Sequence, residues 1–189
     1  MATHEHTDQR DEDRRDRFEV MAREVMEPLR RFLARRTDPA TADDVLADAL
    51  LVCWRRLDDV PDNALPWTYG VARHCLANAE RAQRRQERLA AKIAVVDPPA
   101  AATNDATTYD AGEDGQLESA MAALRREDAE LLRLWAWEQL TPSEIATVLE
   151  ITSNAASIRL HRARERLRVA LRKVDAGSGH EQSREGRKP

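Results

Sequence analysis

The sequence is poor in several features that other classes of protein need. Its only cysteines among 189 residues are Cys53 and Cys75, and neither lies in a CxxC or Cys/His ligand pattern. A disulfide framework and a zinc site are therefore not expected, and both residues are predicted to be buried free thiols. Apolar runs such as 49–54 are far shorter than the roughly 20 residues of a bilayer-spanning helix, and the N terminus is polar and charged. These absences predict a soluble, cytoplasmic chain without membrane insertion.

Signatures of catalysis are also missing. The sequence contains no P-loop, no glycine-rich dinucleotide turn, no HExxH and no convincing nucleophile elbow. An enzyme is therefore not expected, and neither a cofactor nor a metal site is predicted. His74 in particular has no accompanying set of ligands.

Apolar residues recur at helical spacing through most of the chain, and β alternation of useful length is absent, which predicts an all-α fold. Charge is distributed unevenly around the small net value of −4. Residues 94–119 contain six acids and no Lys or Arg, whereas basic residues cluster before and after this stretch. The pattern predicts two small helical domains joined by a flexible acidic linker.

Three stretches in the first half have the spacing of amphipathic helices. The first begins at Phe18, and Pro28 predicts a kink or a break within it. The second begins near Thr41 with acids in its first turn, where the helix dipole favours them. The third opens at Leu65 and continues into an arginine-rich segment, 81–88. Their apolar stripes allow the three helices to share one small core.

The segment 140–172 has the pattern of two short helices joined by a tight turn. Thr141 and Glu144 have the spacing of a capping box for the first helix, and Thr152 can cap the second. The predicted apolar stripe of the second helix is Ile158, Leu160, Ala163 and Leu167. Its other faces carry Asn154, Ser157, Arg159, His161, Arg162, Arg164, Arg166 and Arg168. This arrangement suits insertion into a DNA major groove, and a helical hairpin with a solvated basic face is the alternative.

Three segments together carry a resemblance to a known family: TADDVLADALLVCWRRL (41–57), LPWTYGVARHCLANAERAQRR (65–85) and EIATVLEITSNAASIRLHRARERL (144–167). In this order and spacing, the chain resembles the extracytoplasmic-function sigma factors, the smallest members of the sigma-70 family. The resemblance covers roughly residues 18–172. It implies a domain like sigma region 2 (15–93) and a helix-turn-helix domain like region 4 (117–173), joined by the acidic linker (94–116). The polar residues 1–14 and 174–189 lack apolar periodicity and are predicted to be disordered tails.

The resemblance implies a transcription initiation factor that binds core RNA polymerase, directs it to promoter DNA and has an anti-sigma factor as a further partner. The acidic residues Asp43, Asp44 and Asp48 would then face the polymerase. Region 2 would bind the −10 element and capture an unstacked base, through the loop 58–63 and the exposed face of the third helix. The candidates are Asn63, Trp67, His74, Asn78 and Arg81, of which Trp67 is alternatively a core residue.

Region 4 would place the helix that follows Thr152 in the major groove of the −35 element. Ser153, Asn154, Ser157 and Arg159 would contact bases or adjacent phosphates, and Arg162 and Arg164 would contact phosphates. The sequence departs from the family's pattern at several of its positions. Glu150 stands where Gly is common, so that a left-handed backbone there would be strained. Ser157 replaces a frequently basic residue, His74 stands where Asn is frequent, and Ala47 and Val52 replace polar residues on the polymerase-facing helix.

Two other functions are compatible with parts of the sequence. A helix-turn-helix regulator that binds duplex DNA on its own explains 140–172 but leaves 41–57 and 65–85 without a role. A sigma-like interaction protein, which binds polymerase or an anti-sigma partner without initiating transcription, fits the apolar Ala47 and Val52.

Overall fold

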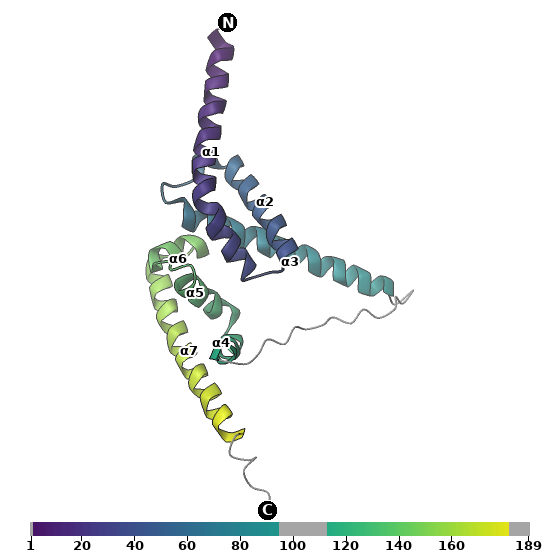
Figure 1. Cartoon of the computed structure of the whole chain (residues 1–189), viewed down its shortest axis with the longest axis vertical. Helices are drawn as coiled ribbons and strands as arrows, with labels where there is room; N and C mark the ends of the chain where they lie inside the picture. Colours follow the sequence, from purple (N-terminus) through teal and green to yellow (C-terminus); the bar gives the residue numbers. More distant parts are fainter. Residues whose placement is uncertain (1, 95–112, 182–189) are drawn as a thin grey trace, which may run out of the picture. The chain divides into compact units, whose positions relative to one another are not determined.

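The computed structural model describes residues 2–94 and 113–181, with side chains over 9–91 and 115–174, and every regular element in these ranges is helical (Figure 1). The elements are α1 (Ala2–Ala34), α2 (Pro39–Arg55), the 3-10 helix η1 (Leu57–Asp59), α3 (Ala64–Ala94), α4 (Glu113–Ala122), α5 (Arg126–Ala136), α6 (Pro142–Leu149) and α7 (Ser153–Glu181). They form two compact units, one built from α1, α2 and α3, the other mainly from α4 to α7. The prediction of an all-α chain is confirmed.

The first unit is a bundle whose core side chains recur every three or four residues along each helix. The buried residues include Val25, Leu29, Phe32 and Leu33 of α1, Val45, Leu46, Ala49 and Cys53 of α2, and Tyr69, Ala72 and Leu76 of α3. The rings of Phe32 and Tyr69 lie 5.0 Å apart and join α1 to α3. Full burial of a large apolar side chain stabilises a fold by about 1.5–3 kcal/mol. Packing of these stripes, more than helix propensity, therefore holds the unit together.

Helix α1 is longer and more continuous than the sequence predicts. It begins at Ala2, so residues 2–14, predicted as a disordered tail, are helical. Pro28 lies inside the helix without ending it, so the predicted break is wrong. Proline removes one backbone hydrogen bond, but Val25 and Leu29 on either side are fully buried, and their packing keeps the chain helical here.

Arg14 anchors the N-terminal part of α1 to the end of α2. Its guanidinium carbon lies 5.1 Å from the ring centroid of Trp54, and its Nη2 donates a 2.8 Å hydrogen bond to the Trp54 carbonyl oxygen. Phe18, one turn later, packs edge-on against the same ring. Arg14 and Arg17 also pair with Asp58 at 3.3 and 3.2 Å. These contacts hold α1 against α2 and η1 from Arg14 onward, in front of the first apolar residue of the sequence pattern.

Helix α2 begins at Pro39, slightly before the predicted start at Thr41. The side chain of Asp38 is the N-cap and accepts a 3.0 Å hydrogen bond from the backbone N–H of Thr41. Hydrogen bonds from Thr41 lower the pKa of Asp38 below its ordinary value. Pro39 suits the first helical position because no hydrogen bond is required of its nitrogen.

The second unit buries small and branched residues from all four of its helices and from the loop between α5 and α6. They include Ala120, Ala129, Leu131, Leu132, Leu134, Leu140, Ile145, Ala156, Leu160 and Ala163. One ion pair crosses this core: Arg166 Nη1 of α7 lies 2.6 Å from Oδ2 of Asp128, a buried carboxylate in the first turn of α5. The pair joins α7 to the first turn of α5.

The predicted linker lies between the two units. Its residues 95–112 lie outside the described residues, while Ala94 and residues 113–116 belong to the helices on either side. The predicted C-terminal tail also differs from the structure, because α7 continues through residues 174–181. The rest of that tail, 182–189, is outside the described residues.

Candidate nucleic-acid interface

The helix-turn-helix begins with the predicted capping box. The backbone N–H of Thr141 donates to Oε2 of Glu144 at 2.8 Å, and the backbone N–H of Glu144 donates to Oγ1 of Thr141 at 3.3 Å. These reciprocal bonds satisfy two donors that would otherwise have no partner at the start of α6. The prediction of this cap from the sequence is confirmed.

The turn between α6 and α7 is tight and contains a left-handed residue. Glu150 has a φ of 54°, the strained conformation expected of a side chain at this position. The backbone N–H of Ile151 bonds to the Ala146 carbonyl oxygen at 3.0 Å and closes the turn. Oγ1 of Thr152 then accepts from the backbone N–H of Ala155 at 3.2 Å, so that Thr152 caps α7 as predicted.

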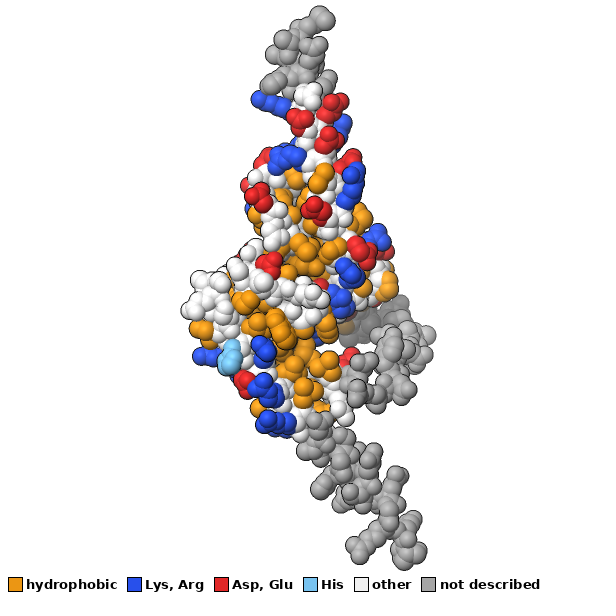
Figure 2. All heavy atoms as spheres, turned by 60° about the vertical axis from the view of Figure 1, so that its left-hand side comes forward, with side chains coloured by type: hydrophobic (Ala, Val, Ile, Leu, Met, Phe, Trp, Pro, Cys, Tyr) orange, Lys and Arg blue, Asp and Glu red, His pale blue; other side chains and the backbone are white. Residues whose placement is uncertain are grey.

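One side of α7 packs into the unit and the remainder faces solvent. Ala156, Leu160 and Ala163 are buried, and Leu167 is half-buried. Ile158, predicted to share that stripe, is 43% exposed, because it lies on the opposite side of the helix. The exposed residues include all of the predicted −35 candidates: Ser153, Asn154, Ser157, Arg159, Arg162 and Arg164. Figure 2 shows Lys and Arg side chains following one another in the lower part of the picture, where α7 runs.

The arginines of α7 divide into two sets that the sequence did not separate. Arg159 and Arg162 have no side-chain partner within the described residues. Arg164 instead lies over the ring of Trp135 on α5, 4.6 Å from its centroid. Arg166 pairs with Asp128, and Arg168 pairs with Glu165. Arg159 and Arg162 are therefore the cations of the N-terminal half of α7 most available to an anionic ligand.

Ser157 has a local partner instead of an open hydroxyl. Its Oγ donates to the Ser153 carbonyl oxygen at 3.0 Å. Such a back-bond keeps the hydroxyl against its own helix. Ser157 can therefore donate to a phosphate only by giving up this hydrogen bond, whereas its oxygen can still accept one from the amino group of a base.

Helix α3 presents a polar stripe opposite its buried face. Trp67, His74, Asn78 and Arg81 are separated by seven, four and three residues, a spacing that places them on one side of a helix. His74, Asn78 and Arg81 are exposed, whereas Ala72 and Leu76 of the other side are buried. Arg81 Nη2 donates to Oδ1 of Asn78 at 2.8 Å. The structure thus brings four of the five −10 candidates onto one helical face.

The remaining −10 candidate, Asn63, is exposed in the loop just before α3. Trp67 is half-buried, and the Arg56 guanidinium carbon lies 5.7 Å from its ring centroid. Arg56 is also paired with Asp59 of η1 at 3.0 Å. Trp67 is thus neither a fully buried core residue nor a free stacking surface.

The predicted acidic patch lies on the solvent side of α2. Asp43, Asp44 and Asp48 are all exposed, as is Ala47 between them. Leu51, one turn after Ala47, is 44% exposed and adds an apolar side chain to this face. The sequence pattern alone did not single out Leu51, although its helical spacing from Ala47 and Asp48 was a usable signal.

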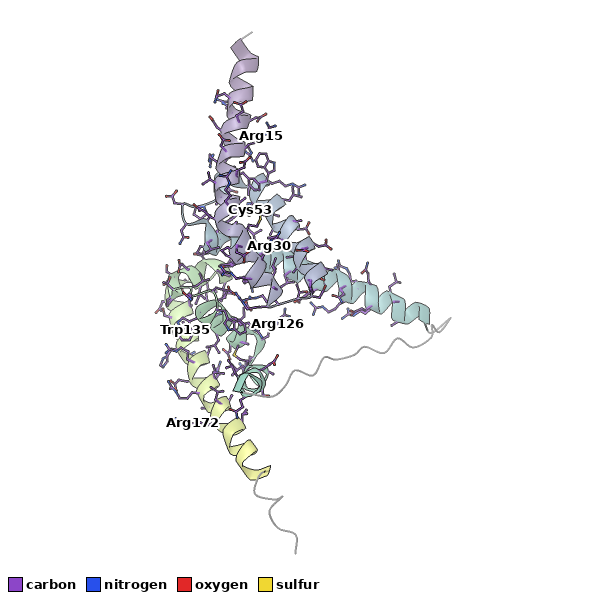
Figure 3. The ribbon with its side chains drawn as sticks, viewed as in Figure 1. Arg15, Arg30, Cys53, Arg126, Trp135 and Arg172 are labelled. Atoms are coloured by element: carbon purple, nitrogen blue, oxygen red, sulfur yellow. The ribbon has the colours of Figure 1, made fainter. Side chains whose placement is uncertain are left out.

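The two thiols are protected groups of the first unit. Cys53 is buried among the three helices and Cys75 is half-buried, and both are free, as predicted (Figure 3). Burial, and secondarily the neighbouring Cys75, raises the pKa of Cys53 to about 11. Burial, and secondarily Asp48, raises the pKa of Cys75 as well. Thiols with raised pKa values are poor nucleophiles.

Two further searches cover the described part of the chain. Within it, no group of three His, Cys, Asp or Glu side chains is arranged to hold a metal ion. Among those same residues, no helix combines the length and the apolar character needed to cross a membrane.

The described residues thus combine a helix-turn-helix that has a basic second helix with a three-helix unit that has an acidic face. The family model described as Sigma-70, region 4 matches residues 114–167, which span α4 to the middle of α7. The second unit is therefore similar to region 4 of the sigma-70 family. The chain as a whole is similar to RNA polymerase sigma factors, some of them named as extracytoplasmic-function (ECF) factors.

Similar proteins span nearly the whole sequence. The RNA polymerase sigma-E factor of Streptomyces avermitilis is 29% identical over 171 residues, which cover 89% of this chain and 93% of the relative. The ECF RNA polymerase sigma factor SigL of Mycobacterium tuberculosis is 29% identical over 151 residues, covering 77% and 84% respectively.

Two solved structures share the fold at low sequence identity. The sigma factor RpoE of Bartonella quintana, in complex with the anti-sigma factor NepR, has a TM-score of 0.54 at 19% identity, covering 82% of this chain and 96% of the other. CnrH, in complex with the cytosolic domain of CnrY, has a TM-score of 0.54 at 21% identity, covering 82% and 88%.

Proposed function

We propose that this chain is a sigma factor that binds core RNA polymerase and directs it to promoters, with the first unit on the −10 element and the second on the −35 element. The observation that carries the proposal is the N-terminal half of α7. It is capped by Thr152, has no acidic residue in its first turn, and presents Asn154 and the unpaired Arg159 and Arg162 to solvent. We propose the domain boundaries 15–93 for the unit that acts on the −10 element and 117–173 for the unit that acts on the −35 element.

In the proposed −35 complex, the start of α7 lies in the major groove. Ser153, Asn154 and Ser157 are close enough to the helix start to face base edges, and Arg159 lies beside them. Arg162, further along, contacts the phosphate backbone. Arg164 reaches a phosphate from above the Trp135 ring, so its contribution is smaller than that of an unpaired arginine.

In the proposed −10 complex, the stripe on α3 receives single-stranded DNA. The exposed His74 and Asn78 offer hydrogen-bonding groups to a base, and Arg81 holds the backbone. Asn63 and Trp67 lie at the start of this stripe, where an unstacked base is captured. The exposed arginines that follow on α3, Arg84, Arg85 and Arg88, continue the positive charge along the strand.

The exposed carboxylates of α2 are the proposed contact with polymerase. Asp43, Asp44 and Asp48 form a single acidic face that suits a basic partner surface. Exchange of Asp44 and Asp48 for Lys should weaken assembly with core polymerase, because it reverses the charge of the proposed contact surface. The fold should remain intact, because both side chains are exposed. A matched control, Asp11→Lys with Glu12→Lys, changes the charge equally on the exposed start of α1. Equal assembly by both double variants in a pull-down with core would remove the assigned interface.

An anti-sigma factor is the proposed regulatory partner. Two solved structures of the same fold contain a sigma factor bound to such a protein or to a cytosolic domain. A protein that works on polymerase and promoter DNA acts in the cytoplasm, which is the location proposed for this chain.

The DNA contact is tested on −35 variants with the assembled holoenzyme. Arg159→Ala should cost about 1–3 kcal/mol at the preferred sequence and flatten the preference there. Arg172→Ala is the matched control: an exposed arginine of the same helix, about 20 Å further along the axis (Figure 3). If the two variants lose affinity equally on all sequences, α7 is not inserted at Arg159. If the chain binds the same duplex equally well without polymerase, it is a conventional regulator.

A further inference from the structure

Ile158 is a large apolar side chain in the middle of the solvent-facing side of α7. It is 43% exposed, although the neighbouring Ala156 and Leu160 are buried. At 3.6 residues per turn, Ile158 lies almost directly opposite the buried stripe. It is the sixth residue of α7 and therefore lies in the half of the helix that presents the proposed −35 residues.

The surroundings of Ile158 are polar and lean towards positive charge. Asn154 precedes it by one turn, and His161 and Arg162 follow it by one turn, all of them exposed. The nearest acid on this side is Glu165, two turns on, whose carboxylate is paired with Arg168. Single exposed apolar residues are ordinary on protein surfaces. Ile158, however, is surrounded by hydrogen-bond donors on an exposed basic helix. That composition, one apolar side chain among donors, is that of a surface that reads base edges.

The major groove of DNA offers one apolar group, the C5-methyl of thymine. We propose that Ile158 contacts a thymine methyl in the −35 element and so makes one A·T pair a preferred base pair. The inference rests on the proposed binding of α7 to the −35 duplex and adds a specificity determinant to it. Ile158 is β-branched and stiff at χ1, so its position in the groove is set by the helix.

Replacement of thymine by deoxyuridine removes only this methyl group. Loss of one such contact should lower affinity about fourfold, the equivalent of one buried methylene-sized group. The experiment uses holoenzyme assembled from the full-length chain and core polymerase, with each thymine of the −35 element replaced in turn. Wild type, Ile158→Ala and Val169→Ala are compared in competition binding. Val169 is the matched control, because it is 50% exposed on the same helix eleven residues further on.

One deoxyuridine should weaken wild type and Val169→Ala alike, by about fourfold, and leave Ile158→Ala unchanged within experimental error. Circular dichroism of Ile158→Ala should match wild type, since the residue is exposed and alanine favours helix. The inference is overturned if every deoxyuridine affects wild type and Ile158→Ala equally, if none affects wild type, or if the preferred −35 element has no thymine on either strand. If wild-type holoenzyme shows no promoter preference at all, the proposed function fails, and this inference with it.

Discussion

Replacement of Glu150 by glycine is expected to stabilise the helix-turn-helix. Glu150 has a φ of 54°, and a residue with a Cβ in this left-handed conformation costs about 1–2 kcal/mol. Glycine removes that strain, but it also increases the freedom of the unfolded chain by about 0.4–1 kcal/mol. The net gain in the free energy of unfolding should be about 0.8 kcal/mol, the middle of a range of about 0–1.6 kcal/mol.

The measurement is urea unfolding followed by tryptophan fluorescence. In a background with Trp54→Phe and Trp67→Phe, only Trp135 and Trp137 of the second unit report on unfolding. Glu150→Ala is the control, because it removes the same carboxylate and keeps the Cβ. If the left-handed backbone at Glu150 is strained by the Cβ, Glu150→Gly should be more stable than Glu150→Ala. Equal stability of the two variants would refute it and assign the effect to the carboxylate.

Three more outcomes follow from the structure. Gln139 also has a positive φ, 56°, so Gln139→Gly should be neutral or stabilising in the same assay, whereas Ser157→Gly within α7 should cost about 0.5–1 kcal/mol. Arg166→Ala should cost about 1–3 kcal/mol, because it leaves the buried carboxylate of Asp128 without its 2.6 Å partner; a loss no larger than that of Arg172→Ala would contradict this. The pKa of Cys53 is raised from 9.0 to about 11, so the folded state keeps its proton where the unfolded state loses it. The free energy of unfolding should therefore fall as pH rises from 9 to 11, and Cys53→Ala should reduce that fall, as measured by urea unfolding at a series of pH values.

The local features of the helix-turn-helix were predictable because each depends on residues close in sequence. The capping box of Thr141 and Glu144 and the cap at Thr152 follow from spacing and hydrogen-bonding chemistry alone. The strain at Glu150 was expected from the family resemblance, in which Gly is common at this position. The −10 candidates on α3 also came from that resemblance, and helical spacing explains why four of them share one face.

Features that depend on contacts between distant segments were not predictable. The sequence showed a row of arginines, but only the fold reveals that Arg164 lies over Trp135 and Arg166 reaches Asp128. The N-terminal extension of α1 was missed for the same reason, since Arg14 is held by Trp54, forty residues away. Ile158 is a different case. Its position opposite Ala156, Leu160 and Ala163 follows from 3.6 residues per turn, so its assignment to the apolar stripe was an error in reading the period and not a hidden contact.

In vitro run-off transcription tests the central claim most directly. Purified chain, core polymerase and a library of candidate promoter fragments are combined, and the start sites are mapped. The account predicts discrete transcripts that appear only when chain and core are both present, with shared sequence upstream at the −10 and −35 positions. Promoter-specific binding by the chain without core, together with no run-off product in the complete reaction, would contradict it.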